Sequence, residues 1–318
     1  MTVAGDGSGA TTMQASPTAA AVQRALTGRR MDVVGVAFEG LLLLTLLIAI
    51  GILAHLLIDV FSRGIGVLVE RGADFLSSPL SQRAQRAGVG QGIIGSILLM
   101  VIVAIVAFPL GVGAAIYLEE YARDTPVTRL INTVVRNLAG VPSIVYGLLG
   151  AAIFIGVLGG LTGGGSVISG GLTLAILVLP IVIITTAEAL RAVPGSIREA
   201  GFGVGATRWE VVRSHVVPYA APGILTGTIL SLARAFGETA PLIVVGAVAG
   251  TFRFSADNLG EQLTGPYTAL PTVVFQWARQ PGDEFRLNTA AAIIVLLIVL
   301  LSVNALAIFL RNRFERKW

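Results

Sequence analysis

The chain has 318 residues, of which 54% are hydrophobic and only 13% are charged, and its mean hydropathy is +0.84. This composition excludes a soluble globular domain, because the polar surface is too small to cover the apolar part. The sequence contains no cysteine, which excludes disulfides, thiolate metal sites and cysteine catalysis. Its two histidines, His55 and His215, are far apart in the sequence and do not favour a metal site.

Six apolar stretches are long enough to cross a hydrocarbon core of about 30 Å, for which roughly 20 helical residues suffice. Their lengths predict helices and not the roughly ten-residue alternating strands of an outer-membrane barrel. The six predicted spans are Val36–Ile58, Gly92–Leu118, Ala139–Gly160, Gly171–Leu190, Pro222–Ala249 and Asn288–Leu310. We therefore predict an all-α, polytopic membrane protein with six transmembrane helices.

The basic residues of the loops predict the orientation of these spans. With the N-terminus inside, the inner segments contain twice as many Arg and Lys residues as the outer segments. The positive-inside rule then places both termini, and a polar loop at residues 191–218, in the cytoplasm. The net charge of +4 is explained by this topology, so no nucleic-acid partner is expected.

The polar loop (residues 191–218) contains two stretches with the spacing of a helix N-terminus. In each capping box, a hydroxyl accepts a backbone N–H and a glutamate three residues later reaches back to the cap. Ser196 and Glu199 form the first pair, and Thr207 and Glu210 form the second. The loop is therefore predicted to contain two short helices.

Glycine and proline mark the ends of these two helices. Gly205 is expected to adopt the left-handed conformation that ends a helix, and Pro218 is expected to stop the second helix. One face of the first helix carries mostly small side chains, namely Ile197, Ala200, Gly201 and Val204. Such a face lets the backbone of a partner protein come close. The alternative is a solvated loop whose caps only stabilise its own helices.

Two charged residues lie inside the fifth predicted span. If the helix starts at Pro222, Arg234 lies about 18 Å and Glu238 about 24 Å along it, at roughly 1.5 Å per residue. A charge at the bilayer centre costs about 3 kcal/mol, so a chance placement is a poor explanation. The two residues are four apart, and we expect them to share a helix face and to pair. Pro241 is expected to kink the same span.

This pair has two possible roles. It can be a structural ion pair that holds helices together. Alternatively, Arg234 attracts an anion on its path through the membrane, and Glu238 keeps the binding weak enough for release.

Other polar and aromatic residues are expected at the membrane surfaces. Glu119 and Glu120 follow the second span and are predicted to be ordinary solvated charges. Tyr267 and Trp277 lie in the outer segment Gly250–Leu287, where they fit an interfacial aromatic belt.

The sequence offers no Walker loop for ATP. Such a loop needs a lysine after its glycines to hold the phosphates, and the only lysine, Lys317, is the residue before the last. A separate ATPase that binds ATP and Mg²⁺ is implied, and this chain needs no cofactor and no catalytic residues of its own.

The order of residues in the polar loop resembles the cytoplasmic loop by which ABC importer permeases are held by their ATPases. The matching positions are Glu199-Ala200-Gly201, Gly205 and Pro218. The sequence departs from the family pattern in three places: Gly201 stands where alanine is usual, His215 where isoleucine is usual and Val217 where leucine is usual.

Three further stretches are more specific. They are Gly140–Gly147, Arg234–Pro241, and Tyr267–Pro271 together with Pro281–Phe285. These stretches resemble PstA-type permeases of bacterial phosphate ABC importers, over a region from about Gly90 to the C-terminus. The resemblance implies a type I ABC importer permease fold and the import of inorganic phosphate.

The resemblance also implies which residues carry the function. The expected substrate pathway consists of Pro142, Ser143, Tyr146, Arg234, Glu238 and Thr239. The expected ATPase coupling positions are Ser196, Glu199, Ala200, Gly201, Gly205, Thr207 and Pro218.

The implied assembly is a heterodimer of this chain with a PstC-type permease in the bacterial plasma membrane. Two PstB-type ATPases would lie on the cytoplasmic side, and a PstS-type phosphate-binding protein on the outer side. Within the chain, residues 1–30 are predicted to be a disordered cytoplasmic tail. Residues 31–90 would form the first transmembrane helix and an outer segment, and 91–318 the permease core.

Two alternatives to a phosphate permease remain open at this stage. The first keeps the importer class and changes the anion to molybdate or sulfate. The second makes the chain chiefly a membrane sensor in phosphate signalling, with transport secondary.

Overall fold

The computed structural model describes residues 33–247 and 258–314, and every regular element in these ranges is helical. The chain divides into two units, residues 1–57 and 58–318, which are described separately. The long helices are α2 (Val33–Ser77), α3 (Gly90–Ile116), α4 (Pro126–Ala139), α7 (Val167–Arg191), α10 (Val217–Gly237) and α14 (Asp283–Phe314). The short helices are α5 (Ser143–Gly150), α6 (Gly159–Thr162), α8 (Gly195–Gly203), α9 (Arg208–Val211), α11 (Ala240–Val244), α12 (Leu259–Thr264) and α13 (Leu270–Trp277). Three π-helical turns are η1 (Tyr117–Tyr121), η2 (Ala151–Val157) and η3 (Val212–Val216). The tail predicted at residues 1–30 lies outside the described residues.

In the first unit, the described residues 33–57 form a single apolar helical stretch of α2. Its large side chains remain exposed, for example Leu47 at 64% and Leu53 at 57%. A helix of this kind is stable only when lipid or another protein covers it. The helix continues past the predicted end of the first span at Ile58, and its regular backbone is interrupted at Gly72, where φ is +36°.

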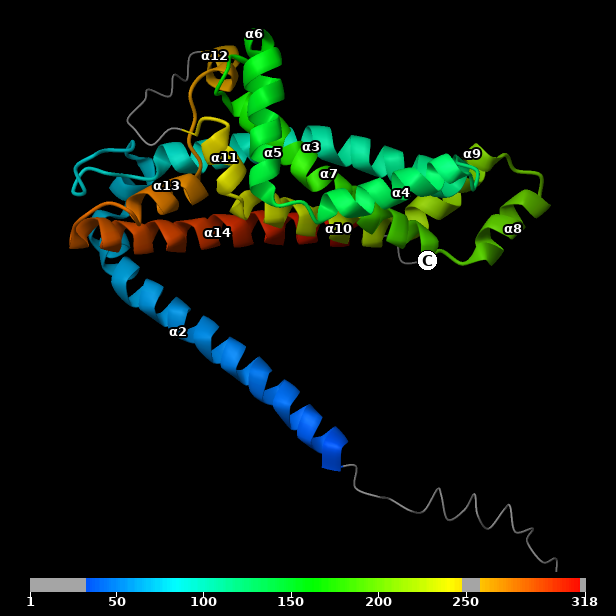
Figure 1. The fold of residues 1–318 in the computed structure, drawn as a ribbon, viewed down its shortest axis with the longest axis horizontal. Helices are drawn as coiled ribbons and strands as arrows, with labels where there is room; N and C mark the ends of the chain where they lie inside the picture. Colours follow the sequence, from blue (N-terminus) through cyan, green and yellow to red (C-terminus); the bar gives the residue numbers. More distant parts are fainter. Residues whose placement is uncertain (1–32, 248–257, 315–318) are drawn as a thin grey trace, which may run out of the picture. The chain divides into compact units, whose positions relative to one another are not determined.

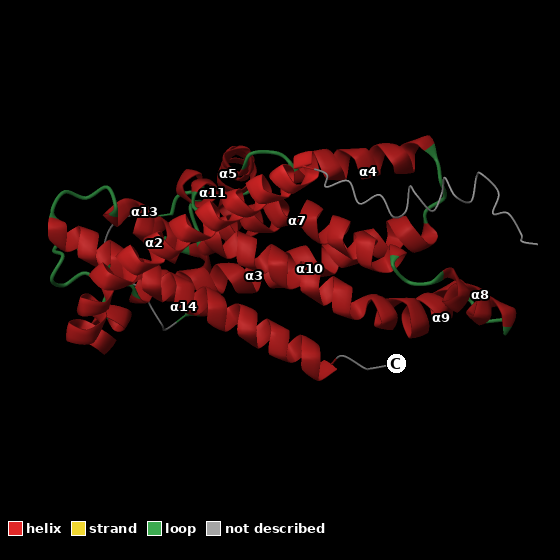
Figure 2. Cartoon of the chain, turned by 90° about the horizontal axis from the view of Figure 1, so that it is seen from below, coloured by secondary structure: helices red, strands yellow, loops and turns green. Residues whose placement is uncertain are grey.

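The second unit is a bundle in which α3, α7, α10 and α14 run lengthwise beside one another (Figure 1, Figure 2). Glycines let α3 and α7 approach closely at the centre: a Cβ placed on Gly171 would lie 2.7 Å from the Cβ of Ile102. Close approach at small residues is the usual way in which membrane helices associate. The buried core around this contact includes Leu99, Val103 and Leu174.

The segment before α14 packs into the bundle, so the prediction of an interfacial aromatic belt is wrong. Trp277 is 4% exposed and lies between the rings of Phe75 and Phe285, at centroid distances of 6.2 and 6.1 Å. Tyr267 is fully buried, its hydroxyl donates to the carbonyl of Leu242 at 3.4 Å, and burial raises its pKa. Both rings are therefore enclosed by other side chains of the protein, and neither can lie at a membrane–water interface.

The third predicted span is not one helix from Ala139 to Gly160. The helix α4 ends at Ala139, and the second piece, Ser143–Val157, is bent from it by 103°. Pro142 causes the break, because its backbone is extended (ψ 135°) and a proline disfavours the helical conformation of the preceding residue. Among the described residues, five helices are long and apolar enough to cross a membrane, or six if this bent pair counts as one span. The prediction of six spans falls within this range, with different boundaries.

The fifth span also differs from its prediction. Pro218 does not stop a helix, because α9, η3 and α10 follow one another without a gap from Arg208 to Gly237. Pro218 lies in the first turn of α10, after a wide turn in which the N–H of Val217 donates to the carbonyl of Val212. A missing N–H is tolerated at such a place. The helix then ends at Gly237, well before the predicted Ala249, which lies outside the described residues.

Candidate functional site

Two stretches that are distant in the sequence meet where α5 packs against α11. A Cβ added to Gly147 would lie 2.8 Å from Cα of Pro241 and 3.1 Å from Cβ of Val244. Only a glycine permits this approach of the two backbones. We call the contact between the stretches 142–147 and 234–241 the motif junction. It brings together two of the sequence stretches that carried the predicted pathway residues.

Arg234 and Glu238 form the predicted ion pair at this junction. Nε of Arg234 lies 3.6 Å from Oε1 of Glu238, and the two side chains are 50% and 19% exposed. They do not share a helix face, however, because α10 ends at Gly237 and the backbone of Glu238 is extended (ψ 126°). Pro241 likewise does not kink the helix, since it belongs to the first turn of the separate helix α11. The expected continuous span is therefore two helices: α10 ends at Gly237, and α11 begins at Ala240 after a short turn.

The remaining predicted pathway residues differ in their surroundings. Tyr146 is 6% exposed, and its hydroxyl donates to the carbonyl of Leu138 at 2.8 Å, which ties α5 to the last turn of α4. Pro142 is exposed, whereas Ser143 and Thr239 are half-buried. Tyr146 therefore ties the two arms of the bend together, and the other three residues keep part of their surface exposed.

The first helix of the polar loop starts earlier than predicted. Pro194 occupies the N-cap of α8, where its carbonyl accepts the N–H of Ile197 at 3.2 Å, and no side chain caps this helix. The prediction that Ser196 caps with Glu199 is therefore wrong. Proline fixes the backbone angle at which a helix can begin, so the start is set two residues before the serine. Ser196, Glu199 and Ala200 all lie exposed on the loop.

The end of α8 and the start of α9 are as predicted. Gly205 has φ of +84°, its N–H donates to the carbonyl of Phe202 at 3.0 Å, and the N–H of Ala206 donates to that of Gly201 at 3.1 Å. This pair of bonds is a Schellman motif. Thr207 then forms the complete capping box: its Oγ1 accepts the N–H of Glu210 at 3.4 Å, and Oε2 of Glu210 accepts the N–H of Thr207 at 2.8 Å.

The stripe of small side chains on α8 is divided between two environments. Gly201 faces inward, where an added Cβ would lie 2.7 Å from Cγ2 of Val211, and Ile197 packs on the same small core. Val204 of the predicted stripe is 85% exposed. Beside it the surface presents two large apolar side chains that the sequence analysis did not single out: Phe202 and Trp209 are 46% and 59% exposed. Apolar residues in an otherwise polar loop were the available signal.

Glu119 and Glu120 are not solvated charges, so that prediction is wrong. They lie in η1 at the end of α3, with side chains 15% and 8% exposed. Glu119 binds Arg191, the last residue of α7, through both carboxylate oxygens. Glu120 binds Arg198 of α8, with Nη2 and Oε1 2.6 Å apart. The signal for these pairs was the presence of two adjacent acids and two arginines at the same predicted membrane surface.

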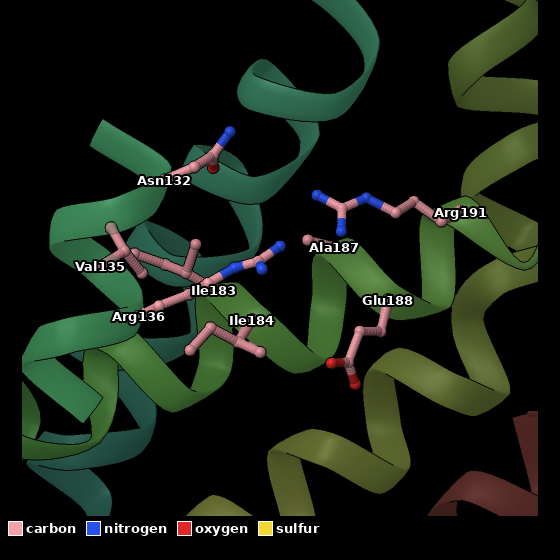
Figure 3. Close-up of a pocket in the computed structure, with 8 residues that line it drawn as sticks. All are labelled: Asn132, Val135, Arg136, Ile183, Ile184, Ala187, Glu188 and Arg191. Atoms are coloured by element: carbon pink, nitrogen blue, oxygen red, sulfur yellow. The ribbon is translucent and has the colours of Figure 1, made fainter. Parts of the chain in front are cut away.

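A small, partly open pocket lies between α4 and α7. Figure 3 shows Arg136 and Arg191 extending into it from opposite sides, while Glu188 points away. Asn132, Val135, Ile183, Ile184 and Ala187 complete the lining. Because Arg191 already binds Glu119, its guanidinium is not a free site for an anion in this pocket.

The comparisons with known proteins agree with this arrangement. Residues 107–318 match the family described as the binding-protein-dependent transport system inner membrane component. The chain is 33% identical over 231 residues to the phosphate transport system permease protein PstA of Xylella fastidiosa, covering 72% of this chain and 77% of that protein. It is 37% identical over 237 residues to PstA of Pasteurella multocida, covering 73% and 78%.

Solved structures of similar fold are chains of ABC transporters. A chain of the MetNI methionine ABC transporter superposes with a TM-score of 0.57 at 16% identity, covering 72% of this chain and 96% of that one. A chain of a bacterial ABC transporter for the polysaccharide alginate gives a TM-score of 0.57 at 15% identity, covering 89% and 98%. The helical architecture is that of a type I ABC importer permease. The chain therefore belongs to the family of binding-protein-dependent transport system inner membrane components, with PstA-type phosphate permeases among its relatives.

Proposed function

We propose that this chain is the membrane-spanning permease subunit of an ATP-driven importer that carries inorganic phosphate across the bacterial plasma membrane. The observation that carries the proposal is the motif junction, where the half-exposed Arg234 stands beside the backbone contact of Gly147 with Pro241. Relatives that match more than two thirds of this chain are phosphate transport permeases.

Arg234 is the residue that would attract the anion. Its side chain is half exposed on a chain whose surface is mostly apolar, and Glu238 at 3.6 Å covers only part of it. An arginine at this depth is stable only against water, a polar ligand or another protein. A phosphate path between this chain and a second, PstC-type permease meets that requirement. Glu238 would keep the site from holding phosphate too tightly, and Pro142, Ser143 and Thr239 would line the same path.

The energy would come from separate PstB-type ATPases, which bind the ATP and Mg²⁺ and act on the polar loop. The exposed apolar side chains of Phe202, Val204 and Trp209 give that loop a surface suited to protein contact. Glu199 and Ala200 lie on the same exposed part of α8. In this arrangement both termini and the polar loop face the cytoplasm, and a PstS-type binding protein delivers phosphate at the opposite side.

The test is purification of the complex from native membranes, followed by reconstitution into lipid vesicles. We expect an ATPase to co-purify, and we expect phosphate-loaded binding protein to stimulate ATP hydrolysis together with phosphate uptake. Competition with molybdate and sulfate, at the same concentrations, measures whether another oxyanion is preferred. A complex without an ATPase, or one that prefers either competitor, would refute the proposal.

A further inference from the structure

Arg198 makes more polar contacts than any other side chain of the polar loop that the structure describes. Its Nη2 binds Oε1 of Glu120 at 2.6 Å and the carbonyl of Leu190 at 2.9 Å. Its Nη1 binds the carbonyl of Val193 at 2.8 Å, and its Nε lies 3.3 Å from Oε2 of Glu120. One guanidinium thus joins three elements: α8, which carries it, the C-terminal end of α7, and the π-helical turn at the end of α3.

This contact is shielded in a way that a surface ion pair is not. The side chains of Glu120 and Arg198 are 8% and 25% exposed. By contrast, the pair Asp124–Arg129, which follows a few residues later, has side chains 81% and 68% exposed at 3.3 Å. Shielded and bidentate charge pairs hold a defined geometry, whereas exposed pairs contribute little.

The contact also supplies a connection that the backbone does not. The helix α8 is joined to α7 by the three residues 192–194, but the chain leads from α3 to α8 only through α4, α5 and α7. The apolar packing of α8 is shared with other helices: Ile197 lies on a small core that includes Leu190 of α7, and Val112 and Ile116 of α3 pack on the same core. Arg198 and Glu120 are therefore the described polar link between α8 and α3.

We propose that Glu120 and Arg198 form a clasp that sets the orientation of α8 relative to α3 and α7. When a partner moves the polar loop, the clasp passes the movement to α3 as well as to α7. Arg191 and Glu119 form a second pair beside it, which fastens the end of α7 to the same turn of α3. Both residues of the clasp are positioning residues, since they act through α8 and α3 and are not among the proposed pathway residues. This inference rests on the proposed function, in which an ATPase acts on the polar loop.

The functional test compares Glu120→Gln with the matched control Asp124→Asn in the purified complex in lipid vesicles. Both substitutions remove one negative charge near the end of α3, but only the first lies in the clasp. We expect Glu120→Gln to lower the number of phosphate ions imported per ATP severalfold while the ATPase still co-purifies. Asp124→Asn should leave that ratio unchanged. Equal ratios for wild type and both variants would overturn the clasp.

A second measurement tests the clasp without transport. The chain contains no cysteine, so spin labels can be attached at Arg123→Cys and Gly203→Cys, which are exposed positions near η1 and at the end of α8. In the complex we expect a narrow distribution of label distances, which Glu120→Gln broadens and Asp124→Asn does not. An unchanged distribution in Glu120→Gln would refute the clasp.

If Glu120→Gln does not assemble, Arg198→Lys provides the same comparison. Its single ammonium group cannot serve both oxygens of Glu120 and both carbonyls, so the distances should broaden while the charge is kept. If the wild-type complex imports no phosphate, the proposed function fails, and the label distances still decide whether the clasp exists.

Discussion

The polar loop and the motif junction both join segments that are distant in the sequence, but different contacts hold them. In the loop, the polar contacts to α3 and α7 are charged pairs, with Arg198 bound to Glu120 and Arg191 bound to Glu119. At the motif junction, backbone packs on backbone, with Gly147 against Pro241. The shielded charge pairs fix the orientation of α8 on α3 and α7, whereas the close-packed backbone contact fixes the distance between α5 and α11. The loop is thus built to pass a movement on to these helices, and the junction is built to keep its shape.

The largest effect is expected when the charge at the motif junction is removed. Arg234→Ala should reduce phosphate uptake by about tenfold or more, because each 1.4 kcal/mol of lost attraction for the anion changes its binding tenfold. The polar loop is untouched, so the ATPase should still co-purify. Initial rates of phosphate uptake into vesicles measure the effect.

Arg286→Ala is the control for Arg234→Ala, since Arg286 belongs to an exposed pair with Asp283 and should change nothing. If Arg234→Ala retained both uptake and stimulated ATP hydrolysis at normal expression, Arg234 and Glu238 would be a structural pair. The motif junction would then have a structural role and would take no part in binding the anion.

The shape of the junction is tested by Gly147→Ala. The added Cβ would lie 2.8 Å from Cα of Pro241, and overpacking of this kind costs about 1–3 kcal/mol. We expect a lower melting temperature of the purified complex and slower uptake. Gly113→Ala in α3 is the control, because nothing lies within 4 Å of its Cβ position. Equal melting temperatures for the two variants would mean that the motif junction accommodates the added methyl group and is not a rigid contact.

Much of the fold follows from hydrophobic length, and its exceptions have local causes. Apolar stretches of sufficient length located the helices that can cross a membrane, but did not predict that Pro142 would bend the third by 103°. Proline appears in many membrane helices without breaking them, because neighbouring helices can satisfy the freed carbonyls. Pro142 breaks its helix, whereas Pro109 and Pro180 lie within α3 and α7. The neighbours that decide between these outcomes are not visible in the sequence.

The candidate site was predictable where the signal is local. Gly205 and the pair Thr207–Glu210 were recognised because a left-handed glycine and a capping box involve residues only a few positions apart. The clasp was missed because Glu120 and Arg198 are far apart in the sequence, and each alone looks like a surface charge. The contact of Gly147 with Pro241 was missed for the same reason, although each stretch was singled out.

A smaller effect is expected from Gly205→Ala in the polar loop. Its φ of +84° costs a residue with a side chain about 1–2 kcal/mol, so the Schellman motif that ends α8 should loosen. The expected result is weaker stimulation of ATP hydrolysis by loaded binding protein, with the preference among phosphate, molybdate and sulfate unchanged. Gly203→Ala is the control, because its Cβ position is open and its φ is not positive. A changed anion preference would show that the polar loop contributes to selectivity. Selectivity would then no longer distinguish the motif junction from the loop.

The smallest effect is expected from Thr207→Ala, which removes the hydroxyl that caps α9. Loss of such a cap costs about 1 kcal/mol of helix stability. The damage should stay local, because α9 continues through η3 into α10 and the rest of that long helix holds it. ATP hydrolysis stimulated by binding protein should therefore fall only slightly, and Thr207→Ser, which keeps the hydroxyl, should restore it. If Thr207→Ala instead prevented the ATPase from co-purifying, the hydroxyl would be a direct contact to the partner. The rigidity of the loop would then matter less than the chemistry of its surface.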